Sequence, residues 1–198
     1  MKKLLLLAVY FLIQGAFAQS GVRLGDPEFI GTGCNKRNSS AVISEDGQTL
    51  SILFDEYQAE AGGNIRRMQD RKGCNVMIPI NVPQGYSVAV MKVDYRGYNS
   101  LPAGAQSEFS VDYFFGGRLG PRYTTTFKGP LDEDFITKNN MTSANVVWSP
   151  CGRPMLLRAH SVMKVATNAQ REQSLSTVDS ADVQAGLVYQ LQWKRCTL

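Results

Sequence analysis

Histidine, closely spaced cysteines and clustered charge are the features that this sequence has least of. Its one histidine is His160, and its four cysteines lie far apart in the chain. The short spacings between the ligands of a structural zinc site are therefore missing. Basic and acidic residues nearly balance, 21 against 17, and no basic block is present. We therefore expect no metal, no cofactor and no nucleic-acid partner.

Recognisable catalytic patterns are scarce as well, and we assign no catalytic residue. The sequence has no Gly-x-Ser-x-Gly motif, so a serine triad would have to be built on His160 without that turn. His160 alternates with Leu156 and Arg158 along an expected strand, which favours a surface or half-buried histidine over a general base. A polysaccharide hydrolase, which needs two facing carboxylates, stays an alternative. Its candidate acids are Asp55, Glu56, Glu60, Asp94 and Asp112.

The one long hydrophobic run lies at the N-terminus. Lys2 and Lys3 precede an apolar run over residues 4–13, and Ala16-Phe17-Ala18 is typical of a signal-peptide cleavage site. The run is too short for a membrane anchor, because a helix that crosses a bilayer needs roughly twenty apolar residues. We expect residues 1–18 to be a cleaved signal peptide. Residues 19–198 are then secreted or periplasmic, with no membrane span.

The four cysteines all follow this segment, at Cys34, Cys74, Cys151 and Cys196. An even number of cysteines in an exported chain predicts two disulfides. Three pairings are possible. We favour Cys34–Cys74 and Cys151–Cys196, where each bond closes a loop of about forty residues and contributes roughly 3–4 kcal/mol.

Alternation of apolar and polar residues predicts about nine β-strands and no long helix. Residues 71–98 read as two strands joined at Pro83-Gln84-Gly85, and both faces of the second are apolar, as in the interior of a sheet. Short connections favour an all-β fold, a single antiparallel β-sandwich domain over residues 19–198 that is stapled by two disulfides. The expected strands cover residues 40–44, 49–54, both halves of 71–98, 106–115, 123–128, 144–148, 155–165 and 187–193. The expected irregular segments cover 19–32, 55–72, 129–141 and 166–185, the last as a loop or a short helix.

Aromatic and acidic residues near strand ends supply the candidate binding groups. Tyr95, Arg96, Tyr98 and Tyr123 are of the types that stack on sugars or contact proteins, with Arg122 as a second cation. The competing interpretation is that these tyrosines tie loops to the sheet. The run Asp132-Glu133-Asp134 offers oxygen ligands for calcium but lacks EF-hand spacing, which favours a solvated acidic loop.

Seven short segments follow one another in a distinctive order along the chain. They are Gly31-Thr32-Gly33-Cys34, Leu53-Phe54-Asp55, Ala59-Glu60-Ala61-Gly62, Arg71-Lys72-Gly73-Cys74, Tyr95-Arg96-Gly97-Tyr98, Thr124-Thr125-Thr126-Phe127 with Gly129-Pro130, and Trp148-Ser149-Pro150-Cys151-Gly152. In this order they resemble the secreted domain-of-unknown-function family 4360, known from bacteria and fungi. The resemblance extends from about Gly31 to Cys196 and implies an exported, β-rich protein with cysteines at these positions. It implies no activity and no catalytic residue.

The leading hypothesis for function is non-catalytic binding of a surface polysaccharide or a protein partner at a loop-rich end of the sandwich. It rests on the fold class, the disulfides and the missing catalytic motifs. The alternatives are a polysaccharide hydrolase with paired carboxylates and a structural component of an envelope or matrix.

Overall fold

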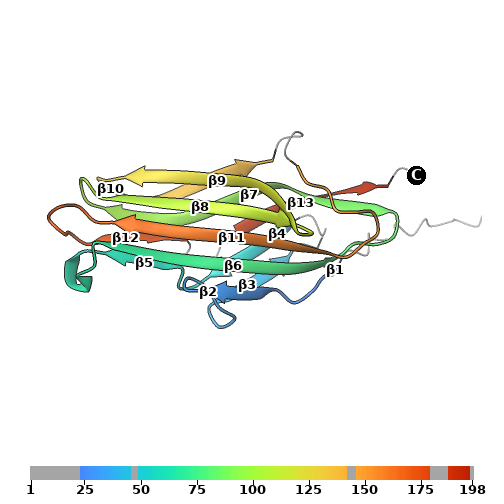
Figure 1. Ribbon diagram of the computed structural model, residues 1–198, viewed down its shortest axis with the longest axis horizontal. Coiled ribbons are helices and arrows are strands. Elements are labelled where there is room, and N and C mark those ends of the chain that lie inside the picture. The colour runs from blue at the N-terminus through green and yellow to red at the C-terminus, as the bar shows by residue number, and fades with distance from the viewer. Residues whose placement is uncertain (1–22, 46–48, 142–145, 179–186, 197–198) are drawn as a thin grey trace, which may run out of the picture.

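Two antiparallel sheets stack face to face in the computed structural model, which describes residues 23–45, 49–141, 146–178 and 187–196 (Figure 1). The expected signal segment lies outside these ranges. Sheet A contains β1 (Arg23–Leu24), β2 (Glu28–Gly31), β6 (Gln69–Asn81), β8 (Gln106–Phe115), β9 (Arg118–Lys128) and β11 (Met155–Ala166). Sheet B contains β3 (Ser39–Ile43), β4 (Thr49–Phe54), β5 (Gln58–Ala61), β7 (Tyr86–Leu101), β10 (Leu131–Asn140), β12 (Ser174–Thr177) and β13 (Leu187–Arg195). The expected all-β antiparallel sandwich is confirmed.

The order of the strands decides which residues share a surface. Sheet A runs β1-β6-β11-β8-β9, and β2 also pairs with β6. Sheet B runs β3-β4-β13-β7-β12-β5, and β10 also pairs with β7. In Figure 1, β9, β8, β11 and β6 lie in front from top to bottom, with β7, β13 and β4 behind them. The two strands expected in residues 71–98 are β6 and β7, and they belong to different sheets. The turn at Gln84-Gly85, where Gly85 has a φ of 82°, therefore carries the chain across the sandwich.

The core forms where alternating side chains of the two sheets meet. In β6 the buried positions are Cys74, Val76, Ile78 and Ile80, and in β8 they include Phe109, Val111, Tyr113 and Phe115. Because side chains alternate along a strand, the residues between them face outward. Three buried tyrosines, Tyr57, Tyr95 and Tyr113, are hydrogen-bonded: the Tyr57 hydroxyl lies 3.1 Å from Ser161 Oγ, and the hydroxyls of Tyr95 and Tyr113 bond to each other. These bonds satisfy phenol groups that burial would otherwise leave unpaired.

Several segments expected to be irregular are strands, so the described residues contain thirteen strands rather than about nine. The additional strands are β1 and β2 in 19–32, β5 in 55–72, β10 in 129–141 and β12 in 166–185. Their local pattern is weak, but each pairs with a neighbouring strand of its sheet, and these tertiary hydrogen bonds decide their conformation. The reverse holds for the strand expected over 144–148. Residues 146–148 are irregular, and the following Ser149 exchanges backbone and side-chain hydrogen bonds with Val88 at the start of β7.

The structure contains both disulfides in the pairing favoured above. Cys34–Cys74 ties the segment after β2 to the middle of β6, and both cysteines are buried in the core. Cys151–Cys196 joins the segment before β11 to the residue that follows β13, near the surface. The helical part of the described ranges is one 3-10 turn, η1 (Gly63–Ile65), and no helix within them is long and apolar enough to cross a membrane.

Candidate binding surface

The outward side chains of β6, β11, β8 and β9 form one surface, here called the sheet A face. Strand pairing aligns these side chains in rows across the sheet. In the central row, His160 lies between Asn75 and Asp112, and Asp112 is opposite Arg122. His160 Nδ1 is 2.9 Å from Asn75 Oδ1, and Arg122 Nη1 donates to Asp112 Oδ2 over 3.3 Å. The row crosses three strand spacings, about 14 Å, as a continuous line of polar groups.

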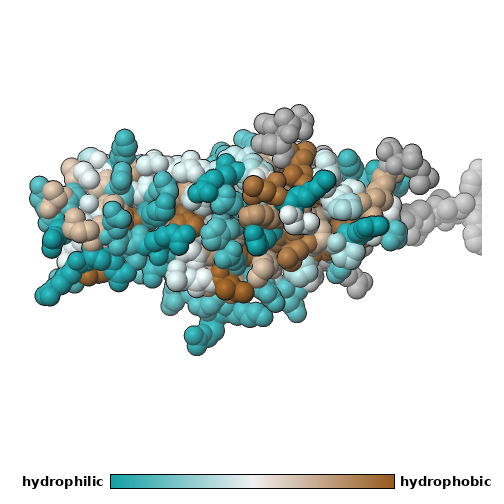
Figure 2. All heavy atoms as spheres, viewed as in Figure 1, coloured by the Kyte–Doolittle hydropathy of each residue, from teal (hydrophilic) through white to brown (hydrophobic). Residues whose placement is uncertain are grey.

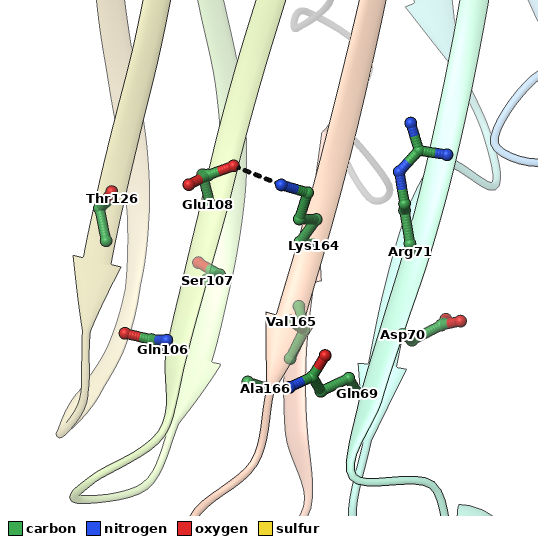
Figure 3. Close-up of a pocket in the computed structure, with 10 residues that line it drawn as sticks. All are labelled: Gln69, Asp70, Arg71, Gln106, Ser107, Glu108, Thr126, Lys164, Val165 and Ala166. Carbon is green, nitrogen blue, oxygen red and sulfur yellow. Dashed lines mark hydrogen bonds and ion pairs between the residues drawn. The ribbon is translucent and has the colours of Figure 1, made fainter.

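A hollow of about 530 Å³ opens on the sheet A face, at the end of the sandwich that carries η1 (Figure 3). It forms because Ala166, a small residue, is paired with Gln69 on one side and Gln106 on the other. Lys164 and Glu108 stand in the next row and form an ion pair of 2.8 Å. The outward polar side chains that line the hollow are Gln69, Arg71, Gln106, Glu108, Thr126 and Lys164.

Asp70 borders this hollow, but its carboxylate is directed to the other side of β6, where it accepts a hydrogen bond from the backbone N–H of Glu60 in β5 over 3.2 Å. Burial alone raises the pKa of Asp70, but hydrogen bonds from the backbones of Glu60 and Arg71 and from the Arg67 side chain outweigh it and bring the pKa below its usual range. The Arg67 Nη1 to Asp70 Oδ1 distance is 2.7 Å. Asp70 is therefore a hydrogen-bond acceptor at neutral pH and does not serve as a proton donor.

Three arginines share the sheet A face with His160. Burial lowers the pKa of His160; the Asp112 carboxylate raises it, and the guanidinium groups of Arg71, Arg158 and Arg122 lower it again, so that the net shift is downward. The imidazole is therefore neutral at pH 7. Its hydrogen bond is to an amide rather than to a carboxylate, and this matches the half-buried strand histidine expected from the sequence.

The other half of the sheet A face is more apolar (Figure 2). Leu156 and Leu119 are 42% and 68% exposed, and Phe114 is paired with both Arg158 and Leu119. The Arg158 guanidinium carbon lies 3.9 Å from the centre of the Phe114 ring. A single face thus combines a polar hollow, a basic middle and an apolar end.

The four residues expected to form a binding site do not share one surface. Tyr95 is in the core, and Tyr123 is half-buried at the edge of the sandwich, where its hydroxyl donates to the Asn140 carbonyl over 2.9 Å. Arg96 and Tyr98 lie on the outer face of sheet B, and the Tyr98 hydroxyl donates to Asp132. For Tyr95 and Tyr123 these contacts match the competing interpretation, in which tyrosines bind parts of the fold together.

The candidate acids and the acidic run are dispersed in the same way. Asp94 lies in sheet B and forms an ion pair with Lys92, whereas Asp112 lies in sheet A. The run from Asp132 to Asp134 belongs to β10 rather than to a loop. Within the described ranges, no three histidine, cysteine, aspartate or glutamate side chains come close enough to hold a metal ion.

Four residues of this surface were not among those predicted from the sequence to bind a ligand: Arg71, Glu108, Arg158 and Lys164. The alternation of Leu156, Arg158 and His160 already put these three on one side of β11. The sequence did not show which strands flank β11, because β6, β8 and β11 are separated in the chain by strands of sheet B.

Residues 20–196 match the family described as a domain of unknown function, DUF4360. The chain belongs to this family. The match confirms the resemblance drawn from the seven segments. A curated relative of this DUF4360 chain is an uncharacterized secreted protein of Arthroderma benhamiae, 33% identical over 168 residues, which are 84% of this chain and 69% of the relative. The secreted relative and the two disulfides indicate an exported protein.

Among solved structures, a GH31 α-xylosidase from Xanthomonas citri is 11% identical, with a TM-score of 0.20. The match covers 88% of the DUF4360 chain but 19% of that enzyme, so the chain spans about a fifth of its length. A similarity this weak carries no argument about fold or function.

Proposed function

We propose that this DUF4360 chain is an exported, non-catalytic binding protein, and that a polysaccharide binds across its sheet A face. The observation that supports this most is the hollow of about 530 Å³, which opens onto a broad sheet surface instead of closing around a small ligand. A polymer chain needs such an open surface, because it enters and leaves on both sides.

The side chains around the hollow suit sugar hydroxyl groups. Gln69 and Gln106 each carry an amide that both donates and accepts, and Thr126 adds a hydroxyl. The carboxylate of Glu108 accepts hydrogen bonds, and Lys164 donates them. Hydroxyl groups of a sugar require this mixture of donors and acceptors in one place.

The contacts of the same carboxylates favour binding over hydrolysis. A glycosidase needs a general acid whose pKa is raised, facing a second carboxylate across the sugar. The pKa of Asp70 is shifted in the opposite direction, and Glu108 is already in an ion pair with Lys164. We therefore retain the hydrolase and the structural component as outcomes of the test.

A glycan array probed with the secreted protein, followed by calorimetry on the polysaccharides that bind, tests the proposal. The double variant Gln69→Ala with Gln106→Ala should bind roughly tenfold more weakly, because removal of the two amides leaves hydroxyl groups of the ligand without hydrogen-bond partners. Gln58→Ala, an exposed glutamine of sheet B, is the matched control and should bind normally. A blank array contradicts the proposal. Reducing sugars released during incubation would favour the hydrolase, and self-association at low concentration would favour the structural component.

A further inference from the structure

We propose that the polysaccharide is acidic, and that Arg71, Arg122 and Arg158, gathered around His160, bind its carboxylate groups. This inference rests on the proposed function and adds the chemical class of the ligand. The three arginines come from three strands, β6, β9 and β11, and all are outward residues of one face: Arg122 lies in the row of His160, Arg158 one row to one side, and Arg71 two rows to the other side. Their convergence is therefore a property of the folded sheet and is not visible as a basic run in the sequence.

The arrangement of β6 lets Arg71 reach the middle of the face. Arg71 and Asn75 are outward residues on either side of Gly73, which has no side chain. A Cβ placed on Gly73 would find only the Ser161 carbonyl within 4 Å, at 3.7 Å, so the space above the glycine is open. In Figure 3 the Arg71 side chain extends along β6, away from Asp70.

Positive charge on this part of the face exceeds negative charge. Asp112 is in an ion pair with Arg122, and Glu108 is in an ion pair with Lys164. In the part of the chain that the structure describes, neither Arg71 nor Arg158 forms an ion pair, and the buried Nε of Arg158 has no hydrogen-bond partner. Two guanidinium groups are thus left without a carboxylate, which is the complement of an anionic polymer.

Carboxylates match these groups in shape as well as in charge. A guanidinium presents two parallel N–H groups that match the two oxygens of a planar carboxylate. The ring of Phe114 supports Arg158 from one side, 3.9 Å below its guanidinium carbon, and so limits the freedom that this side chain would lose on binding. The hollow, only two rows of side chains from His160, supplies hydrogen bonds for the hydroxyls of the same sugar chain.

The test compares polygalacturonate with its methyl-esterified form, which has the same backbone without the charge. Calorimetry on the secreted protein should show at least about tenfold tighter binding to the acid than to the ester, since each charge-assisted hydrogen bond contributes that much. The acid form should also bind more weakly as salt is added.

Matched variants distinguish a binding site on sheet A from one on sheet B. Arg71→Gln with Arg158→Gln should bind polygalacturonate at least about tenfold more weakly, whereas Arg96→Gln, which removes the same charge from the outer face of sheet B, should bind normally. If loss of Arg158 impairs folding, Arg71→Gln alone tests the same claim, because Arg71 is exposed.

Equal affinity for the acid and the ester would overturn the carboxylate assignment. A loss of binding in Arg96→Gln but not in the double variant would move the site to sheet B. If the wild-type protein binds neutral glycans only, the proposed function survives and this inference fails. If it binds no polysaccharide, both fail.

Discussion

Removing the two disulfides separately should show how much each contributes, because their loops are nearly equal in length. The sequence separations are 40 for Cys34–Cys74 and 45 for Cys151–Cys196. Loop-closure entropy therefore gives about 4 kcal/mol for either bond. Any clear difference between the two losses of stability must therefore come from packing in the native state.

The packing around the two bonds differs strongly. Cys34 and Cys74 are 1% and 0% exposed within the core, so alanine at both positions leaves unfilled space and costs about 1–2 kcal/mol more. Cys151 is exposed and Cys196 half-buried, so little is added there. We expect a loss of about 5–6 kcal/mol for Cys34→Ala with Cys74→Ala, and of about 4 kcal/mol for Cys151→Ala with Cys196→Ala.

Urea unfolding followed by circular dichroism measures both losses, and each double variant is the control for the other. Whole domains are stable by only about 5–15 kcal/mol, so the loss of the buried disulfide alone is large enough to prevent folding. That result agrees with the expectation if the variant without the surface disulfide does fold. Equal losses, or a larger loss from the surface pair, would refute the packing argument.

Three further predictions concern the core and the sheet A face. Gly33→Ala should cost more than about 2 kcal/mol, because its Cβ would lie 2.3 Å from the Tyr57 ring, whereas Gly73→Ala should be nearly neutral in the same unfolding assay. Burial raises the pKa of Tyr57 and Tyr113, so their stabilisation is complete below about pH 10 and is lost above it by about 1.4 kcal/mol per pH unit for each group. Absorbance at 295 nm should therefore show two tyrosines that ionise only as the protein unfolds; ionisation of every tyrosine near pH 10 in a folded protein would contradict this. The lowered pKa of His160 means that the folded state loses stability as the pH falls below about 6.5, so His160→Gln should unfold at a less pH-dependent temperature between pH 7 and 5 than the wild type.

The strands that carry the core could be predicted from the sequence because alternation is a local property. Leu50, Ile52 and Phe54 mark β4, and Phe109, Val111, Tyr113 and Phe115 mark β8, with every one of them buried. Segments such as β5 and β12 have no such signal. They are strands because partners distant in the sequence offer hydrogen bonds, and that information is not present in any short window.

The candidate surface depended on the order of the strands, which alternation does not give. Tyr95 and Tyr98 are close in the sequence and of a type common in binding sites, yet the odd spacing puts them on opposite sides of β7. Between Arg71 and Arg158 the chain forms four strands, two in each sheet, and the two residues share a face only because β6 pairs with β11. Charged and polar residues on neighbouring strands of one sheet therefore could not be grouped before the pairing of the strands was known.

A footprint of the bound polysaccharide tests the central claim most directly. Hydrogen–deuterium exchange of the secreted protein, with and without the polysaccharide that binds best on the array, reports which strands the ligand covers. The account predicts slower exchange in β6, β8, β9 and β11, centred on Asn75, His160 and Asp112, with β7 and β10 unchanged. Protection centred on Arg96 and Tyr98 in β7 would place the ligand on sheet B and contradict the account.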